Sequence, residues 1–273
     1  MGRQLVSQLL PALEKLEWTG TEEATAAGHT VFQVALDQVD SFRDDPAILG
    51  AALRTLRTTD SLPYAYAGVA YLLIAAARET DGDYDPTGLE HALAWLERAQ
   101  EMSGDVVDIN VVEALVYIYF GRFDDARLVL DYLHDQMPNS YYLCRAEMAF
   151  WRRQEDVAAA FEWGEKAMQA ADTVPQRLRV KGKMGDLYLE TGNVEQALQT
   201  YREALHFDRQ NAELYHKLSL IYADQEEYEE AKRMNEKALS LRPDFTEAQR
   251  LQVMLAEKGE NDSSGLMGRL FGR

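Results

Sequence analysis

The stretch MGDLY at residues 184–188 returns as LSLIY at residues 218–222, and this pair decides the fold. The two stretches lie 34 residues apart and end on the same aromatic residue. Further positions match at this offset, namely Ala197 with Ala231, Tyr201 with Asn235, Ala204 with Ala238 and Phe207 with Leu241, and Pro243 closes the second copy. Small and apolar positions that recur at this spacing are typical of a helix-turn-helix unit that stacks on its neighbours.

The same register extends toward the N-terminus. Units that start at residues 107 and 141 abut without a gap and keep small residues at the contact positions. Those small residues are Ala114, Ala126, Ala160 and Ala167. A unit that starts at residue 61 keeps the register only when about 12 extra residues, including the acidic stretch 80–86, are placed between its two helices.

This pattern resembles the tetratricopeptide repeat (TPR). The resemblance implies an all-α fold, a right-handed superhelix (α-solenoid) of antiparallel helix pairs with extra N-terminal helices and a C-terminal capping helix. The implied organisation is N-terminal helices over 1–60, as a degenerate repeat or a cap; five units over 61–106, 107–140, 141–174, 178–211 and 212–245; a capping helix over 246–258; and a flexible tail with an apolar-basic motif over 259–273.

The composition indicates a folded protein that does not bind nucleic acid. Hydrophobic residues make up 47% of the chain, and 46 acidic against 28 basic residues give a net charge of -18. So acidic a chain repels a phosphate backbone. The single cysteine, Cys144, excludes an internal disulfide and favours a reducing, cytoplasmic location. The longest apolar stretch, residues 62–77, is shorter than the roughly 20 residues that cross a bilayer, so no stable membrane insertion is expected.

The residues do not combine into a recognisable catalytic, cofactor or metal site. The five histidines have no pair at the spacing of zinc ligands, and no phosphate loop, dinucleotide fingerprint or nucleophile elbow occurs. Cys144 lies at a packing position, which favours a buried thiol over a nucleophile. The stretch 81–86 begins like a calcium loop, but Pro86 and Ala92 occupy the positions of its glycine and its bidentate glutamate. We therefore expect a protein that is not an enzyme and holds no cofactor or metal.

The resemblance implies a concave groove lined by the first helix of each unit. At its N-terminal end the implied lining, within residues 62–73 and 108–119, is almost wholly apolar. Two interpretations are open. The N-terminal helices pack into this end, because a large exposed apolar surface is costly for a soluble monomer. Alternatively, this end binds an apolar partner segment or a second copy of the chain.

The middle of the implied groove is basic. It either forms a solvated face paired with local carboxylates such as Glu147 and Asp156, or captures a carboxylate or an acidic peptide. The asparagines with which chaperone-tail-binding TPR proteins clamp a carboxylate are absent from the matching positions. The predicted partner contacts of the groove are Arg145, Arg152, Arg153, Arg179, Lys183, Tyr142, Tyr119 and Tyr66.

The C-terminal stretch 259–273 carries a second candidate motif. Its apolar-basic residues are Leu266, Arg269, Leu270 and Phe271. The stretch is a frayed end, a short linear motif that docks on another protein, or a weak membrane-surface contact. Together these features predict a TPR scaffold or adaptor whose partner is a protein or an acidic peptide. The alternative is a structural subunit that forms homo-oligomers through the apolar groove or the tail.

Overall fold

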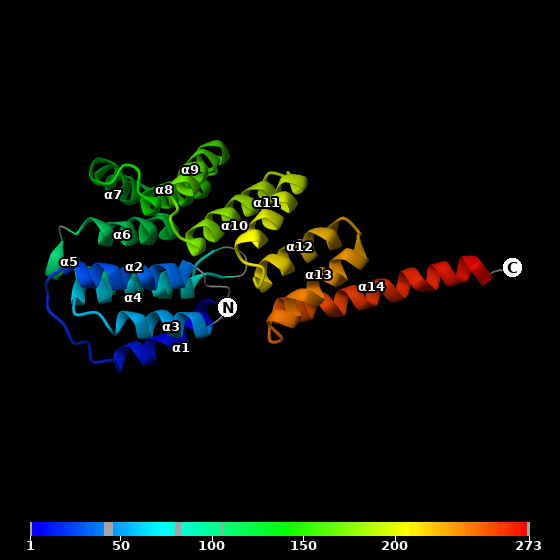
Figure 1. Cartoon of the computed structure of the whole chain (residues 1–273), viewed down its shortest axis with the longest axis horizontal. Coiled ribbons are helices and arrows are strands. Elements are labelled where there is room, and N and C mark those ends of the chain that lie inside the picture. The colour runs from blue at the N-terminus through cyan, green and yellow to red at the C-terminus, as the bar shows by residue number, and fades with distance from the viewer. Residues whose placement is uncertain (1, 41–45, 80–82, 105, 272–273) are drawn as a thin grey trace. The chain divides into compact units, whose positions relative to one another are not determined.

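The computed structural model describes residues 2–40, 46–79, 83–104 and 106–271, with the side chains of Pro46 and of residues 259–271 left out. The described residues form fourteen helices and no strand. The chain divides into two compact units, Met1–Val180 (unit 1) and Lys181–Arg273 (unit 2) (Figure 1). The helices are α1 (Gly2–Glu14), α2 (Ala26–Asp40), α3 (Pro46–Leu56), α4 (Leu62–Ala77), α5 (Pro86–Ser103), α6 (Val107–Phe120), α7 (Phe123–Gln136), α8 (Tyr141–Arg153), α9 (Val157–Ala170), α10 (Val174–Glu190), α11 (Val194–Phe207), α12 (Ala212–Asp224), α13 (Tyr228–Leu241) and α14 (Thr246–Phe271).

The small residues of the repeat lie where two helices pack closely. Helix axes approach to about 8–10 Å only when the side chains between them are small. A Cβ added to Gly185 of α10 would lie 2.4 Å from a ring atom of the buried Tyr201 of α11. The predicted small positions are fully buried, at Ala114, Ala126, Ala160, Ala167, Ala197, Ala204, Ala231 and Ala238.

The two helices of a repeat are joined by a residue in the left-handed region of backbone space. Gly121 and Gly192 take φ values of 76° and 74° at this turn. Glu155 and Glu226 hold the same place in their repeats and also have positive φ, 62° and 61°. Left-handed backbone costs a residue with a Cβ roughly 1–2 kcal/mol, so helix packing enforces this turn even where the sequence lacks glycine.

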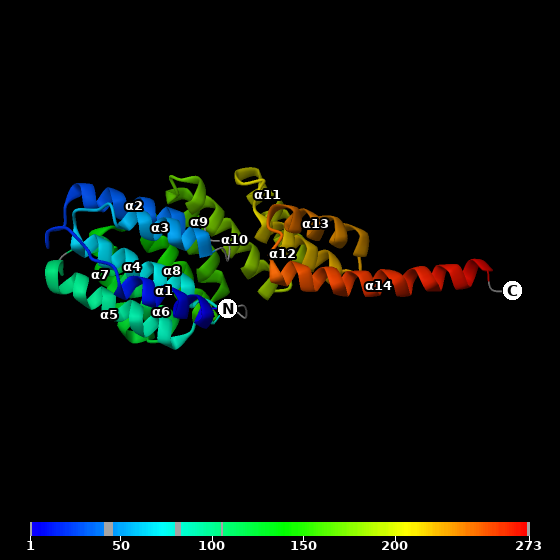
Figure 2. The same ribbon diagram turned by 90° about the horizontal axis from the view of Figure 1, so that it is seen from below.

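Helix α4 is the centre of unit 1. Every residue from Pro63 to Ala77 is buried, because α4 packs against α1, α2, α3, α5 and α6. Figure 2 shows α1 beside α4 and α5. The contact between α3 and α4 is so close that a Cβ added to Gly68 would lie 2.3 Å from Leu56. The N-terminal helices therefore cover the apolar end of the implied groove, as the first of the two sequence interpretations has it.

Helix α14 begins where the capping helix is predicted and continues past it. Its first turn packs on α13, where Asn235 Nδ2 donates to the carbonyl of Ala248 at 2.8 Å. The prediction ends the helix at Lys258, whereas α14 runs to Phe271. The side chains of the tail motif, Leu266, Arg269, Leu270 and Phe271, lie outside the described part of the structure.

Candidate functional site

Helix α2 lies along the groove of unit 1. It contacts the first helix of four successive repeats, α4, α6, α8 and α10. Asp40 at its C-terminal end accepts a hydrogen bond from Tyr71 of α4 and pairs with Arg145 of α8. The other polar contacts are His29 Nε2 with Asp108 of α6 at 3.1 Å and Gln176 Nε2 of α10 with Asp37 at 3.1 Å. Since these four helices line the implied groove, α2 fills it from within the chain.

The buried centre of this contact is an ion pair. Arg145 Nη1 lies 2.7 Å from Asp40 Oδ1, and Arg145 also hydrogen-bonds Tyr71. Tyr71 and Tyr141 donate to the two oxygens of Asp40 at 2.5 and 3.1 Å. Burial is the largest single influence and lowers the pKa of Arg145, but Asp40 and the neighbouring tyrosines together raise that pKa well above its usual value.

Arg145 is therefore not the partner contact that the sequence predicts. Its side chain is buried and its charge is neutralised by a residue 105 positions away in the chain. No local pattern reveals Asp40 as the partner, because it sits at the end of a helix outside the clear repeats. The interpretation as a face paired with Glu147 or Asp156 is wrong for Arg145 as well, since its partner is Asp40.

Four other predicted contacts in unit 1 are buried or partly buried side chains. Tyr66 is buried against the edges of Trp18 and Trp95, with ring centroids 6.0 and 5.1 Å away. Tyr142 is buried, and its hydroxyl has no hydrogen-bond partner among the described residues. Arg152 and Arg153 are partly buried, and Arg153 pairs with Asp83 at 2.9 Å.

Three predicted contacts meet at one small cavity. Tyr119, Arg145 and Arg179 line it, from α6, α8 and α10. Its volume of about 10 Å³ is close to that of one water-sized sphere, so no side chain of a partner fits inside. The full lining is Tyr71, Ile74, Ala75, Arg78, Tyr84, Leu115, Tyr119, Arg145 and Arg179.

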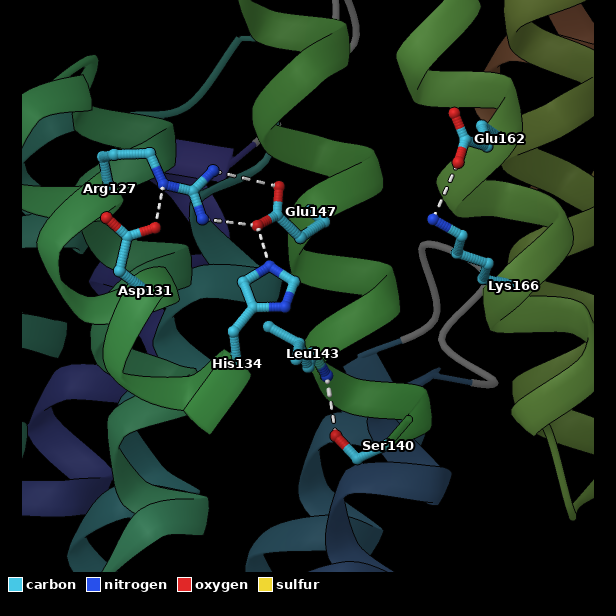
Figure 3. Close-up of polar contacts among 8 residues, drawn as sticks. All are labelled: Arg127, Asp131, His134, Ser140, Leu143, Glu147, Glu162 and Lys166. Atoms are coloured by element: carbon cyan, nitrogen blue, oxygen red, sulfur yellow. Dashed lines mark hydrogen bonds and ion pairs between the residues drawn. The ribbon is translucent and has the colours of Figure 1, made fainter. Parts of the chain in front are cut away.

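A second buried ion pair connects α7 to α8. Glu147 is almost fully buried and accepts from Arg127 Nη2 at 2.6 Å, while His134 Nε2 lies 2.7 Å from the same oxygen (Figure 3). Burial lowers the pKa of Arg127, but its bonds to Glu147 raise that pKa above the usual value overall. Asp156 accepts from the backbone N–H of Ala159 and so caps α9. Glu147 and Asp156 therefore stabilise helices.

Unit 2 leaves apolar side chains exposed at the position that the resemblance places in the groove. Asp186, Leu220 and Met254 occupy this position in α10, α12 and α14, at successive 34-residue intervals. Leu220 and Met254 are 45% and 53% exposed. Both side chains therefore leave apolar surface exposed at a position that the resemblance places in the groove.

An ion-pair network borders these apolar residues. Lys217 Nζ lies 2.5 Å from Asp186, Tyr201 donates to the same carboxylate at 2.7 Å, and Lys183 Nζ lies 3.7 Å away. Burial raises the pKa of Asp186, but the two lysines outweigh burial and hold that pKa well below its usual value. Lys183, the predicted contact in unit 2, therefore belongs to this network.

Within the described residues, no group of His, Cys, Asp or Glu could hold a metal ion, and no helix is long and apolar enough to span a membrane. Cys144 is buried, and burial raises the pKa of its thiol, which disfavours the reactive thiolate at neutral pH.

Comparison with known proteins supports the repeat. Residues 185–226 match the family model described as TPR repeat, and residues 212–245 match the model described as tetratricopeptide repeat. The tetratricopeptide repeat predicted from the sequence is thereby confirmed for residues 185–245. No curated protein matches the sequence.

Solved structures with a similar fold include pilF of Pseudomonas aeruginosa, at 19% sequence identity and a TM-score of 0.55, covering 78% of this chain and 93% of that chain. One chain of the Cut9–Hcn1 hetero-tetramer of the APC/C aligns at 12% identity and a TM-score of 0.57, covering 84% of this chain and 46% of that chain. At such identities the likeness shows the fold alone, and it confirms the all-α, TPR-type arrangement of helix pairs.

Proposed function

We propose that this chain is a non-catalytic scaffold that binds a segment of another protein on the concave face of unit 2. The observation that carries the proposal is the difference between the two grooves. Helix α2 fills the groove of unit 1, whereas Leu220 and Met254 stay exposed at the groove position of unit 2. TPR folds serve in general as protein-interaction scaffolds, and an exposed apolar strip with a polar border is typical of such a surface.

The partner proposed for this surface presents an apolar side chain between polar groups. Full burial of a leucine-sized side chain contributes about 1.5–3 kcal/mol, and Leu220 has roughly half of its surface left to bury. The sequence predicts an acidic partner from its basic groove residues, which are Arg145, Arg152, Arg153, Arg179 and Lys183. In the structure Arg145 and Arg179 line a small cavity of unit 1. Arg153 pairs with Asp83 and Lys183 with Asp186. The polar border of unit 2 mixes Lys217 with Asp186 and Glu213 and has no single sign.

Peptide selection on the full-length protein tests the proposal. A random peptide library is displayed and selected on the wild-type chain, and the affinities of enriched peptides are measured by fluorescence anisotropy. We expect Leu220→Glu and Met254→Glu each to weaken binding by about tenfold, or 1.4 kcal/mol. Leu128→Glu is the matched control, since Leu128 is a 71% exposed leucine on α7 of unit 1. The proposal fails if no peptide is enriched or if the control weakens binding equally.

Self-assembly is the alternative outcome of the same experiment. Contacts of α1, α2 and α3 with the buried α4 argue against the apolar N-terminal groove as the surface for a second copy. The C-terminal tail stays the other predicted surface for self-assembly. Light scattering across a concentration series gives the oligomeric state. A concentration-dependent oligomer that Met254→Glu dissociates would overturn the peptide proposal and assign this face to contacts between copies.

A further inference from the structure

The small cavity of unit 1 is bordered by several positively charged side chains. Three arginines line it, from the end of α4, from α8 and from α10, and no carboxylate among the described residues is part of its lining. Asp40 lies beside the cavity and neutralises Arg145 through the buried ion pair. Arg78 has interactions of its own within the chain.

Arg179 is the exception among these three arginines. Within the described part of the chain it forms no hydrogen bond or ion pair. Burial lowers the pKa of Arg179, the negative charge of Asp40 raises it, and the positive charge of Arg145 lowers it. A guanidinium group taken out of water costs free energy unless an anion or hydrogen-bond acceptors satisfy it. The partly buried Arg179 therefore lacks the partner that such a position calls for.

The hydroxyl groups around the cavity add hydrogen-bond donors. Tyr84 and Tyr119 stack with ring centroids 4.0 Å apart, and both line the cavity. Burial raises the pKa of Tyr84 far above its usual value, so its hydroxyl keeps its proton at neutral pH. Donors of this kind suit an anion that is small enough to enter.

The geometry points to a binding site for one halide-sized anion, such as chloride, held by Arg179 with the hydroxyls of Tyr119 on α6 and of Tyr84 between α4 and α5. The cavity volume of about 10 Å³ admits one water-sized species and excludes sulfate or phosphate. Water could accept the hydrogen bonds but could not balance the charge, whereas a halide does both. The site lies wholly in unit 1 and is independent of the peptide surface proposed for unit 2.

Chloride-35 NMR on the full chain tests this site. We expect excess chloride line width for the wild type that bromide removes and sulfate at equal ionic strength does not. Arg179→Gln should abolish the excess. Arg177→Gln should keep it, because Arg177 lies on the same helix and donates to the carbonyl of Ala171 instead. Tyr119→Phe keeps the stacked ring and should weaken chloride binding several-fold. This variant tests the site even if Arg179→Gln fails to fold.

A second measurement ties the anion to unit 1. The thermal midpoint seen by tryptophan fluorescence should be higher in sodium chloride than in sodium gluconate at equal ionic strength, because a ligand of the folded state raises stability. Arg179→Gln should remove that difference. Equal line widths for the wild type and Arg179→Gln, displacement by sulfate, or an unchanged midpoint difference in Arg179→Gln would each overturn the proposal.

Discussion

Removal of Asp40 should destabilise unit 1 more than any substitution at an exposed ion pair. In the variant Asp40→Ala, Arg145 stays in its buried position without the carboxylate 2.7 Å away, and two tyrosine hydroxyls lose their acceptor. Breaking a buried ion pair from one side typically costs about 3–5 kcal/mol of folding free energy, because the remaining charge has no counter-charge and no water.

Two further variants separate this cause from a general loss of side-chain contacts. Asp125→Ala removes a carboxylate from an exposed pair, in which Arg122 and Asp125 are 48% and 44% exposed, and should cost less than about 1 kcal/mol. The double variant Asp40→Leu/Arg145→Leu removes both charges together. It should recover much of the stability lost by Asp40→Ala, since no unpaired charge is left in the interior.

Tryptophan fluorescence during urea unfolding is the assay. All four tryptophans, Trp18, Trp95, Trp151 and Trp163, lie in unit 1, so the signal follows that unit alone. With a urea dependence of about 2–3 kcal/mol per M, the expected cost of about 3–5 kcal/mol lowers the unfolding midpoint by about 1–2.5 M. The reasoning is refuted if Asp40→Ala costs no more than Asp125→Ala, or if the double variant is as unstable as the single one.

Three further predictions concern the repeats around unit 2. Gly185→Ala should destabilise the fold by about 1–3 kcal/mol in urea unfolding followed by circular dichroism, because its Cβ meets the ring of Tyr201 at 2.4 Å. Gly182→Ala on the same helix has nothing within 4 Å and should stabilise by up to about 1 kcal/mol; equal effects of the two would contradict the packing argument. Glu226→Gly should raise the free energy of unfolding by up to about 1 kcal/mol, because glycine adopts the left-handed backbone without a clash. Hydrogen exchange measures the effect, and lower protection of the nearby amides in Glu226→Gly would contradict this prediction. The pKa of Asp186 is held low in the folded state, so its contribution is complete above the unfolded value of about 3.9 and is lost as the pH falls through the folded value. Asp186→Asn should therefore be less stable than the wild type at pH 7, and the difference should shrink in acid; a difference that does not change with pH would exclude this linkage.

The repeat could be predicted because its signal is local. Alanines such as Ala197 and Ala231 recur at the spacing with which helix pairs stack, and the structure buries them completely. The turns show the limit of this signal. Gly121 and Gly192 mark their turns in the sequence, whereas Glu226 gives no sign of the left-handed conformation that packing enforces on it.

The candidate site could be predicted only as a set of groove positions. Leu220 and Met254 occupy a groove position of the repeat, but they are not among the partner contacts predicted from the sequence, and only the structure shows that both are exposed. The arginines at other groove positions in unit 1 gave the wrong expectation for Arg145, since its environment depends on α2. The register of one helix says which of its faces points toward the groove, but not whether another segment already fills the groove.

The sequence by itself determined that this chain is a stack of helix pairs, because helix packing at 34-residue intervals requires small residues at fixed places, and those places are visible in the chain. Only the tertiary structure decided which groove is open. Asp40 and Arg145 are 105 residues apart, and their pairing is a consequence of where α2 folds back. Contacts between residues so far apart in the sequence depend on how the whole chain folds. They decide which surfaces remain exposed, but they produce no recognisable pattern in the local sequence.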